Sequence, residues 1–298
     1  MSIKAVLAPP LNRPVQKHFF PAIEEGTRIP RIIHQTFYTP DLPSGLQENV
    51  DRLKALNPGW DYRFYDDAAI VDFIVKNYPP IVLQYFQRID PRYGAARADL
   101  FRYLLMYKVG GVYLDIKSSA TQPLDEVLQP EDRFLLSEWN NESEEYDVWG
   151  KHYELRDFGG REFQQWYIAC APGHPFLRAV VDNVLQNIDI YIPGLHGTGK
   201  PGVLRVTGPI AYSLAIHRIR AAHPHRIVNS QQDLGFQYSV MTVNSHKTEF
   251  KSHYSLQTHS VVKLGFVKSK TTHLYRMAQA AHDFSKRRRK PLAPSSGG

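Results

Sequence analysis

The sequence predicts an α/β fold in which helices flank a mixed, mostly parallel sheet. Segments with helical periodicity alternate with short apolar segments along most of the chain, an order typical of parallel strands joined by crossover helices. One apolar segment ends at Asp115, and such sheets bind ligands beyond the carboxyl ends of their strands. With 298 residues, 43% of them hydrophobic, the chain can bury a large core. We therefore expect one main domain, over residues 29–284.

The expected elements begin at residue 31, and proline or glycine closes the early helices. Asn57-Pro58-Gly59 ends the first helix and Tyr78-Pro79-Pro80 ends the second. Strands are expected at 31–37, 60–65, 112–116, 133–137 and 167–171, and helices at 46–56, 69–77, 94–109, 175–187 and from Thr207 toward Ala222.

The remaining segments are expected to be irregular. Residues 1–28 are rich in proline and predict a loosely held arm. The glycine-rich segment 191–202 predicts a mobile flap, and Thr207 is the expected N-cap of the helix that follows it. Residues 285–298 predict a basic, disordered tail.

The segment from Gly94 to Lys117 is the most informative part of the chain. Its first part predicts a helix, because alanine and large apolar residues recur at spacings of one, three and four. Gly110-Gly111 ends this helix, since glycine accepts the left-handed backbone of a helix C-terminus. Residues 112–116 then predict a short buried strand.

Four charged residues lie on this helix and strand. Asp99 and Arg102 are three residues apart and share one helix face, while Asp115 and Lys117 are two apart and share one strand face. Charges at the edge of an apolar unit are costly unless they are paired or bind something. The alternatives to a binding site are a surface ion pair on the helix and a solvated carboxylate at the strand end.

Net charge, cysteine content and the distribution of apolar residues limit the kinds of ligand and site that the protein can have. The net charge of +7 suits an anionic ligand, such as a nucleotide diphosphate, or an anionic surface. The single cysteine, Cys170, excludes an internal disulfide and a cysteine-based zinc site. The sequence has no membrane-spanning stretch and no secretory signal, so a cytoplasmic location is expected, with the basic run 286–290 contacting an anionic membrane face. No nucleic-acid partner is expected, because no recognised motif accompanies that run.

Four segments together resemble glycosyltransferase family 32, which includes the Golgi initiating alpha-1,6-mannosyltransferases and bacterial capsule and lipopolysaccharide transferases. Its pattern is an Asp and an Arg three apart, a Gly-Gly, an aromatic residue and Asp-X-Asp. Here these are Asp99, Arg102, Gly110-Gly111, Tyr113 and Asp115-Ile116-Lys117. Residues 29–37, 161–178 and 205–216 resemble the family's first strand, its acceptor-side strand and helix, and its Thr-Gly-Pro helix start.

The resemblance implies a GT-A-type, Rossmann-like fold and a hexosyltransferase of polysaccharide biosynthesis. The donor is expected to be a UDP- or GDP-linked sugar and the acceptor a glycan or glycolipid, with retention of configuration. Asp99 and Arg102 are then expected to bind the donor sugar, Tyr113 to line the donor site, and Asp115 to contact the ribose, a metal or both. With Lys117 facing the diphosphate, the four charged residues are the expected catalytic residues.

Lys117 departs from the family pattern, which has a second aspartate at this position, and a protonated lysine cannot ligate a metal. In one hypothesis, Mn²⁺ or Mg²⁺ remains, bound by Asp115 and by a carboxylate or histidine from the C-terminal part, with His259 and His253 as candidates. In a second, Lys117 neutralises the phosphates itself and metal dependence is reduced. In a third, the protein is a catalytically silent glycan- or nucleotide-sugar-binding protein of the same fold.

Two further pairs are candidates by the same resemblance. His34 and Gln35 end the first strand, where the family binds the nucleotide base and ribose; the alternative is a buried, hydrogen-bonded polar pair. Gln165 and Trp166 precede a strand on the acceptor side, where the ring can stack on a sugar and the amide can bond its hydroxyls. A tryptophan of the core is the alternative there. Glu138 and Asp147 follow a predicted strand and are further acceptor-side candidates; the alternative is that both are surface charges.

Overall fold

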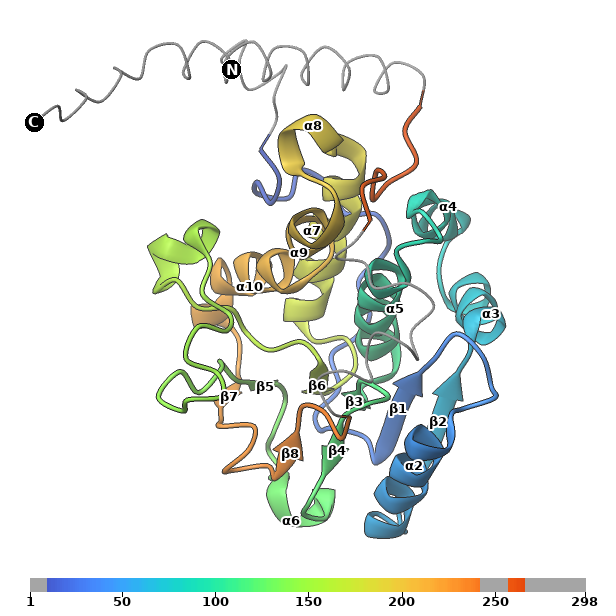
Figure 1. The fold of residues 1–298 in the computed structure, drawn as a ribbon, viewed down its shortest axis with the longest axis vertical. Helices are drawn as coiled ribbons and strands as arrows, with labels where there is room; N and C mark the ends of the chain where they lie inside the picture. Colours follow the sequence, from blue (N-terminus) through green and yellow to red (C-terminus); the bar gives the residue numbers. More distant parts are fainter. Residues whose placement is uncertain (1–9, 242–256, 266–298) are drawn as a thin grey trace, which may run out of the picture.

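The computed structural model describes residues 10–241 and 257–265, and the statements below concern those residues (Figure 1). The strands are β1 (Ile32–Thr36), β2 (Asp61–Tyr65), β3 (Gly111–Leu114), β4 (Ser119–Ala120), β5 (Leu135–Leu136), β6 (Tyr167–Cys170), β7 (Arg226–Ile227) and β8 (Phe236–Gln237). The helices are α2 (Ser44–Leu56), α3 (Asp67–Asn77), α4 (Pro80–Arg88), α5 (Gly94–Val109), α6 (Leu124–Val127), α7 (Pro175–Ile190), α8 (Pro193–His196), α9 (Gly199–Val206) and α10 (Pro209–His217). Two short 3₁₀ helices, η1 (Tyr153–Phe158) and η2 (Arg220–Ala222), complete the set.

The central sheet has the strand order β2-β1-β3-β6. Strands β2, β1 and β3 are parallel, and β6 runs antiparallel to β3. This arrangement confirms the predicted mixed, mostly parallel sheet flanked by helices. Because β6 is antiparallel, its beginning lies beside the end of β3, with Tyr167 opposite Leu114. The residues just before β6 are therefore brought to the same sheet edge as the residues just after β3.

Side chains of β3 alternate between two layers of core, as the pleat of a strand requires. Tyr113 packs in the larger cluster, with side chains of α3, α4, α5, α7, α9 and α10. Val112 and Leu114 point to the other face and pack with Leu53 of α2 and Phe236 of β8. Helices α5, α7, α9 and α10 lie close together over the first face in Figure 1. The sheet is thus buried on both sides, and only its edges are open to a ligand.

Two glycines reverse the chain between α5 and β3. Gly110 has φ 69°, and a Cβ there would lie 2.6 Å from the backbone nitrogen of Pro172. Gly111 has φ 103°, and a Cβ there would lie 2.6 Å from the carbonyl oxygen of Ile32. Both positions therefore require glycine, for the backbone angle and for the close approach. The predicted helix end at this point is confirmed.

The chain reversal at Gly110 brings Asp99 on α5 and Asp115 at the end of β3 to the same height along the sheet. Asp99 lies eleven residues before Gly110, which is about 16 Å of helix at ~1.5 Å per residue. Asp115 lies five residues after it, which is about 16 Å of strand at ~3.3 Å per residue. The two different rises per residue thus place carboxylates that are far apart in sequence beside each other.

Several expected features are wrong. A helix that was not predicted, α4, begins at Pro80, since proline suits the first turn. Segment 191–202 was expected to be a flap, but α8 and the start of α9 occupy it. Helix α10 ends at His217, short of the predicted Ala222.

Residues 10–28 are not a loosely held arm. The side-chain amides of Asn183 and Asn187 on α7 donate hydrogen bonds to Asn12 Oδ1 at 2.8 and 2.7 Å. Phe20 is buried in the larger core cluster. These contacts tie the segment to α7. Residues 1–9 and the predicted tail at 285–298 lie outside the described residues. Within the part that is described, no helix combines the length and apolarity needed to cross a bilayer.

Candidate active site

A buried cluster of three charged residues lies where α5 meets the end of β3. Arg102 is 5% exposed and Asp99 is 4% exposed. Arg102 Nη1 lies 3.0 Å from Asp115 Oδ1, and Nη2 lies 3.5 Å from Asp99 Oδ1. The guanidinium group therefore bridges two carboxylates. The side chain of Asp115 is 24% exposed, so this member of the cluster faces the open edge of the sheet.

The pKa directions in the cluster follow from burial and charge. Burial raises the pKa of Asp99, while Arg102 and hydrogen bonds from Thr207 and Gln165 act in the opposite direction. Burial works to lower the pKa of Arg102, but Asp115, Tyr113 and Asp99 outweigh it and raise that pKa. The guanidinium group is therefore a permanent cation with two carboxylates held around it.

Two residues outside α5 donate hydrogen bonds to the Asp99 carboxylate. Thr207 Oγ1 donates to Asp99 Oδ2 at 2.9 Å, and Gln165 Nε2 donates to Asp99 Oδ1 at 3.1 Å. Arg102 Nη1 also donates to the carbonyl oxygen of Gln165 at 2.7 Å. Thr207 does not cap α10, whose N-cap is Gly208 without a side-chain hydrogen bond, so that prediction is wrong. Its hydroxyl binds the buried carboxylate instead, a role the sequence analysis missed.

Tyr113 supports the same cluster from β3. Its ring centroid lies 4.9 Å from Cζ of Arg102, and its hydroxyl donates to Asp115 Oδ1 at 3.3 Å. Burial raises the pKa of Tyr113 well above its usual value, so the hydroxyl remains protonated and a donor. The Tyr113 hydroxyl and Arg102 Nη1 thus both contact Oδ1 of Asp115, which orients its carboxylate.

Lys117 does not share a strand face with Asp115 as predicted. Strand β3 ends at Leu114, and a turn follows in which the amide of Ser118 donates to the carbonyl of Asp115 at 2.7 Å. The turn places Lys117 Nζ 3.7 Å from the ring centroid of Tyr238. Burial lowers the pKa of Lys117 to about 8, with Asp115 acting to raise it and Arg102 to lower it. Lys117 is thus within electrostatic reach of Asp115 and Arg102, while its ammonium group contacts the Tyr238 ring.

His34 and Gln35 lie beneath the site, both fully buried. The His34 ring nitrogens lie 3.0 Å from the Gly110 carbonyl oxygen and 3.2 Å from the Tyr65 hydroxyl. Burial lowers the pKa of His34 to about 4. Gln35 Nε2 donates to the carbonyl of Asp115 at 3.2 Å. The structure therefore gives these residues contacts within the protein, and their contact with a nucleotide remains a prediction.

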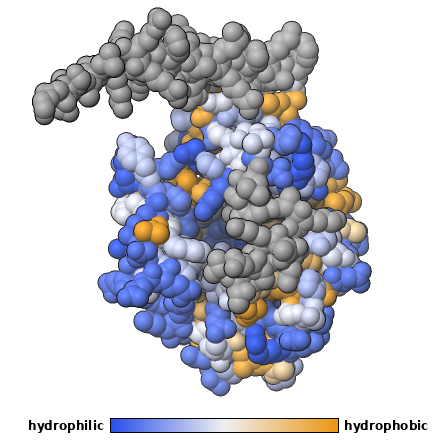
Figure 2. Space-filling model, in the orientation of Figure 1, coloured by the Kyte–Doolittle hydropathy of each residue, from blue (hydrophilic) through white to orange (hydrophobic). Residues whose placement is uncertain are grey.

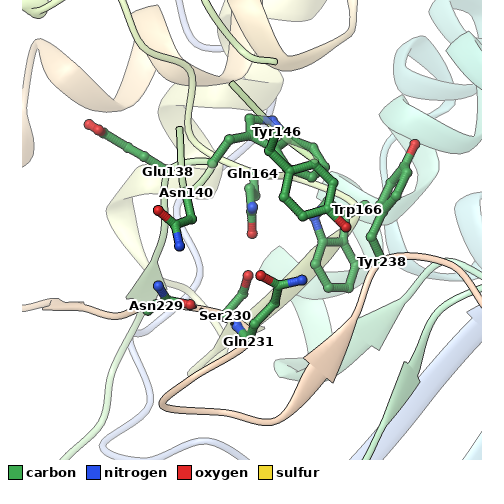
Figure 3. A pocket seen from close by; sticks show the side chains of 10 residues that line it. Glu138, Asn140, Tyr146, Gln164, Trp166, Asn229, Ser230, Gln231 and Tyr238 are labelled. Atoms are coloured by element: carbon green, nitrogen blue, oxygen red, sulfur yellow. Dashed lines mark hydrogen bonds between the residues drawn. The ribbon is translucent and has the colours of Figure 1, made fainter. Parts of the chain in front are cut away.

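Trp166 links the charged cluster to a neighbouring pocket. Its carbonyl oxygen accepts a hydrogen bond of 2.8 Å from the amide of Asp115, and its ring packs against Tyr238 with centroids 5.6 Å apart. Both side chains line the pocket shown in Figure 3. Glu138, another acceptor-side candidate, lines the same pocket. The donor-side and acceptor-side candidates thus meet at one sheet edge.

The described residues contain no group of three His, Cys, Asp or Glu side chains placed to hold a divalent metal. His259 is exposed, and its carbonyl oxygen accepts a hydrogen bond of 2.6 Å from the Tyr93 hydroxyl. His253 lies outside the described residues. Among the described residues Asp115 therefore offers a single carboxylate, and the other ligands of a metal would come from outside them, for example from substrate phosphates.

Comparison with known proteins identifies the region that contains this cluster. Residues 43–135 match the family model described as a glycosyltransferase sugar-binding region containing a DXD motif. Asp99, Arg102, Tyr113 and Asp115 all fall within the match. This part of the chain is similar to the sugar-binding region of that glycosyltransferase family. In its members the motif has a second aspartate, where this chain has Lys117.

Two curated relatives of this chain are named mannosyltransferases. Inositol phosphoceramide mannosyltransferase 3 of Schizosaccharomyces pombe is 30% identical over 195 residues, which are 64% of this chain and 45% of the relative. The initiation-specific alpha-1,6-mannosyltransferase of Candida albicans is 29% identical over 138 residues, which are 43% of this chain and 34% of the relative. The chain thus spans about half the length of the first relative, and less of the second.

Among solved structures, the chain is similar to the PaToxG glycosyltransferase. The TM-score is 0.48 and the sequence identity 14%, and the match covers 89% of each chain.

Proposed function

We propose that this protein is a glycosyltransferase that moves a hexose from a nucleoside diphosphate sugar to a glycan or glycolipid acceptor. The observation that carries the proposal is the buried bridge from Asp99 through Arg102 to Asp115 at the carboxyl edge of β3. It lies inside the family's sugar-binding region. A buried charge network is costly to form, and this one has a partly exposed carboxylate at its outer end.

The buried and the partly exposed residues of the site have different roles in this proposal. Asp99 and Arg102 are buried and bonded to protein atoms, so they act here by holding Asp115 in one orientation. Asp115 presents its carboxylate to the donor. In the reaction, negative charge grows on the leaving diphosphate, and fixed cations beside it lower the barrier. Lys117, two residues after Asp115, is the cation that we assign to the diphosphate; its ammonium group lies over the Tyr238 ring.

A divalent metal shared between Asp115 and the diphosphate would supply the same charge stabilisation when bound. The chain's own contribution differs between the two cases. With a metal, Asp115 is the carboxylate that the described residues would offer it, and Lys117 adds a second positive charge. Without a metal, Lys117 is the residue that we assign to the phosphates. Retention of configuration and the use of Mn²⁺ or Mg²⁺ are parts of this proposal that the resemblance to the family implies. A cytoplasmic place of action is a further part, and it rests on the sequence alone.

A thermal-shift panel of UDP, GDP and their sugars, with and without Mn²⁺, tests the proposal. A nucleotide that binds only the folded state raises the melting temperature by mass action. The expected result is a shift with one of the two nucleotides and turnover of its sugar conjugate. No shift and no turnover with any donor would overturn it. An EDTA titration of that turnover then separates the metal-assisted case from the lysine-only case.

Lys117 favours a second candidate, a nucleotide-sugar-binding protein without turnover, because it stands where the family has an acid. Release of free sugar from the bound donor distinguishes the two. Slow hydrolysis by the wild-type protein supports the transferase, whereas binding with no hydrolysis and no transfer supports the silent protein.

A further inference from the structure

We propose that Tyr238 is a positioning residue, which holds the ammonium group of Lys117 by a cation–π contact without neutralising its charge. The proposal rests on the function proposed above, in which Lys117 is assigned to the diphosphate, and adds to it the residue that keeps this cation in place. Lys117 Nζ lies over the Tyr238 ring, 3.7 Å from its centroid. A cation within about 6 Å of an aromatic face is attracted by the partial negative charge of that face.

Strand pairing brings Lys117 and Tyr238 together. Strands β4 and β8 lie side by side in Figure 1 and are antiparallel, and their register, continued by one residue, puts Ser118 opposite Tyr238. The Ser118 hydroxyl donates to the Tyr238 carbonyl oxygen at 2.7 Å. The Val240 amide donates to the Lys117 carbonyl oxygen at 2.8 Å. The backbone on both sides of the contact is therefore fixed by pairing between the two segments.

The ring of Tyr238 is itself held in place by three other rings. Its centroid lies 5.2, 5.5 and 5.6 Å from the centroids of Trp139, Trp149 and Trp166, with interplanar angles of 84°, 80° and 72°. Such edge-to-face pairs are a favourable arrangement of aromatic rings. Figure 3 shows Trp166 and Tyr238 next to each other. A ring with three such neighbours has little freedom to turn, so it offers the lysine a fixed surface.

The group that holds Lys117 is a neutral ring and not a carboxylate. Among the residues that the structure describes, no Asp or Glu forms an ion pair with Lys117. Asp115, two residues away, is paired with Arg102 at 3.0 Å. An ion pair would cancel the charge of the lysine, whereas a ring leaves the full positive charge and the N–H groups that point away from it. The held ammonium group thus remains available to phosphate oxygens.

The contact with the ring orders the lysine before the donor binds. A free lysine side chain has many rotamers, and fixing it during binding costs free energy. A side chain that is already fixed avoids this cost, so binding of an anionic ligand is tighter. It also presents its charge without rearrangement when negative charge grows on the leaving diphosphate. Loss of the Tyr238 ring should therefore weaken binding of a nucleoside diphosphate.

The test is the affinity for UDP and GDP, measured by isothermal titration calorimetry in the presence of Mg²⁺. Tyr238→Leu is expected to raise the Kd of the nucleotide that binds by about 3- to 10-fold, whereas Tyr238→Phe keeps the ring and should stay within about 2-fold of the wild type. Phenylalanines with one, two and three ring fluorines at position 238 keep the shape of the ring but weaken its negative face. The Kd should rise in steps along this series.

Lys117→Met shows whether the ring acts through the lysine, because methionine is also unbranched but carries no charge. In that background, Tyr238→Leu is expected to add no further loss of affinity. A double-mutant cycle of this kind separates a ring that positions Lys117 from a ring that contacts the nucleotide directly.

Tyr153→Leu is the matched control. Arg156 Cζ lies 4.3 Å from the centroid of the Tyr153 ring, so this tyrosine also has a cation over it, but it is 77% exposed. It begins η1, which belongs to the yellow-green segment at the left of Figure 1, and that part of the surface is mostly hydrophilic in Figure 2. The control should leave the Kd of the nucleotide unchanged.

A Kd that is constant along the fluorinated series would overturn the proposal, as would an undiminished effect of Tyr238→Leu in the Lys117→Met background. Both results leave the proposed function intact, since the wild-type protein still binds the nucleotide and transfers its sugar. The fluorinated series tests the contact even if Tyr238→Leu does not fold. Failure of the wild-type protein to bind UDP or GDP and to turn over any donor would instead remove the proposed function, and with it this role of Tyr238.

Discussion

Arg102 on α5 lies 3.0 Å from Asp115 at the end of β3, and this ion pair joins the helix to the strand edge. The pair is asymmetric, since the guanidinium group is almost fully buried and the carboxylate is partly exposed. A buried cation keeps its place only if its partners remain charged. The pair therefore links stability and function.

Arg102→Ala is expected to lower the free energy of unfolding by about 3–5 kcal/mol, because it leaves the buried Asp99 carboxylate without its cation. Arg102→Lys should recover part of this loss but not the bridge, since an ammonium group cannot donate in a planar fork. Urea denaturation measures both. Arg97→Ala on the same helix, at a half-buried position, serves as the control. Equal losses for Arg97→Ala and Arg102→Ala would contradict the bridging role.

Asp115→Ala is expected to reduce transfer by at least ~10²-fold while the protein stays folded, because the side chain is partly exposed and contributes little packing. Asp125→Ala, an exposed carboxylate paired with Arg31, is the matched control. Transfer kinetics and circular dichroism together check the result. Turnover near that of the wild type in the Asp115 variant would remove the main site assignment.

Thr207→Val is expected to cost about 1–3 kcal/mol, because a buried carboxylate oxygen of Asp99 loses its 2.9 Å hydrogen bond while the side-chain volume is kept. Thr207→Ser retains the hydroxyl and should restore most of the stability and the donor KM. Thermal unfolding with and without the nucleotide distinguishes these variants. Identical behaviour of the valine and serine variants would show that the hydroxyl has no role.

Lys117→Asp restores the second acid of the family motif and is expected to make turnover dependent on Mn²⁺. The variant should lose activity in EDTA and regain it when Mn²⁺ is added in excess. Replacing a cation with a carboxylate removes the positive charge near the diphosphate, which only a metal can then supply. An unchanged response to EDTA, relative to the wild type, would argue that residue 117 lies away from the phosphates.

Acid pH is expected to destabilise the protein through His34. Burial lowers the pKa of His34 to about 4 from the usual 6.5, so the unfolded chain binds the proton more tightly than the folded protein. Its contribution to stability is complete above pH 6.5 and is lost as the pH falls toward 4, by up to about 3 kcal/mol. His34→Gln should flatten this part of the stability profile. Parallel profiles for the two proteins would contradict it.

Local signals in the sequence were sufficient for the helix, glycine and strand unit that carries Asp99, Arg102 and Asp115. Periodicity predicted α5, and Gly110-Gly111 predicted its end, because both depend on backbone preferences within a few residues. The fixed rises per residue of helix and strand then bring the charges together. The motif could therefore be recognised, and its members do lie in contact.

The tertiary structure alone decided what surrounds that motif. Thr207 reaches Asp99 from 108 residues away and Gln165 from 66 residues away, and no periodic pattern encodes such pairings. The antiparallel direction of β6, which places Trp166 beside Asp115, depends on packing against β3. The turn after Leu114, which sends Lys117 toward Tyr238, depends on where residue 238 lies. Contacts between distant segments are set by how whole elements pack, and spacing along the chain does not contain that information.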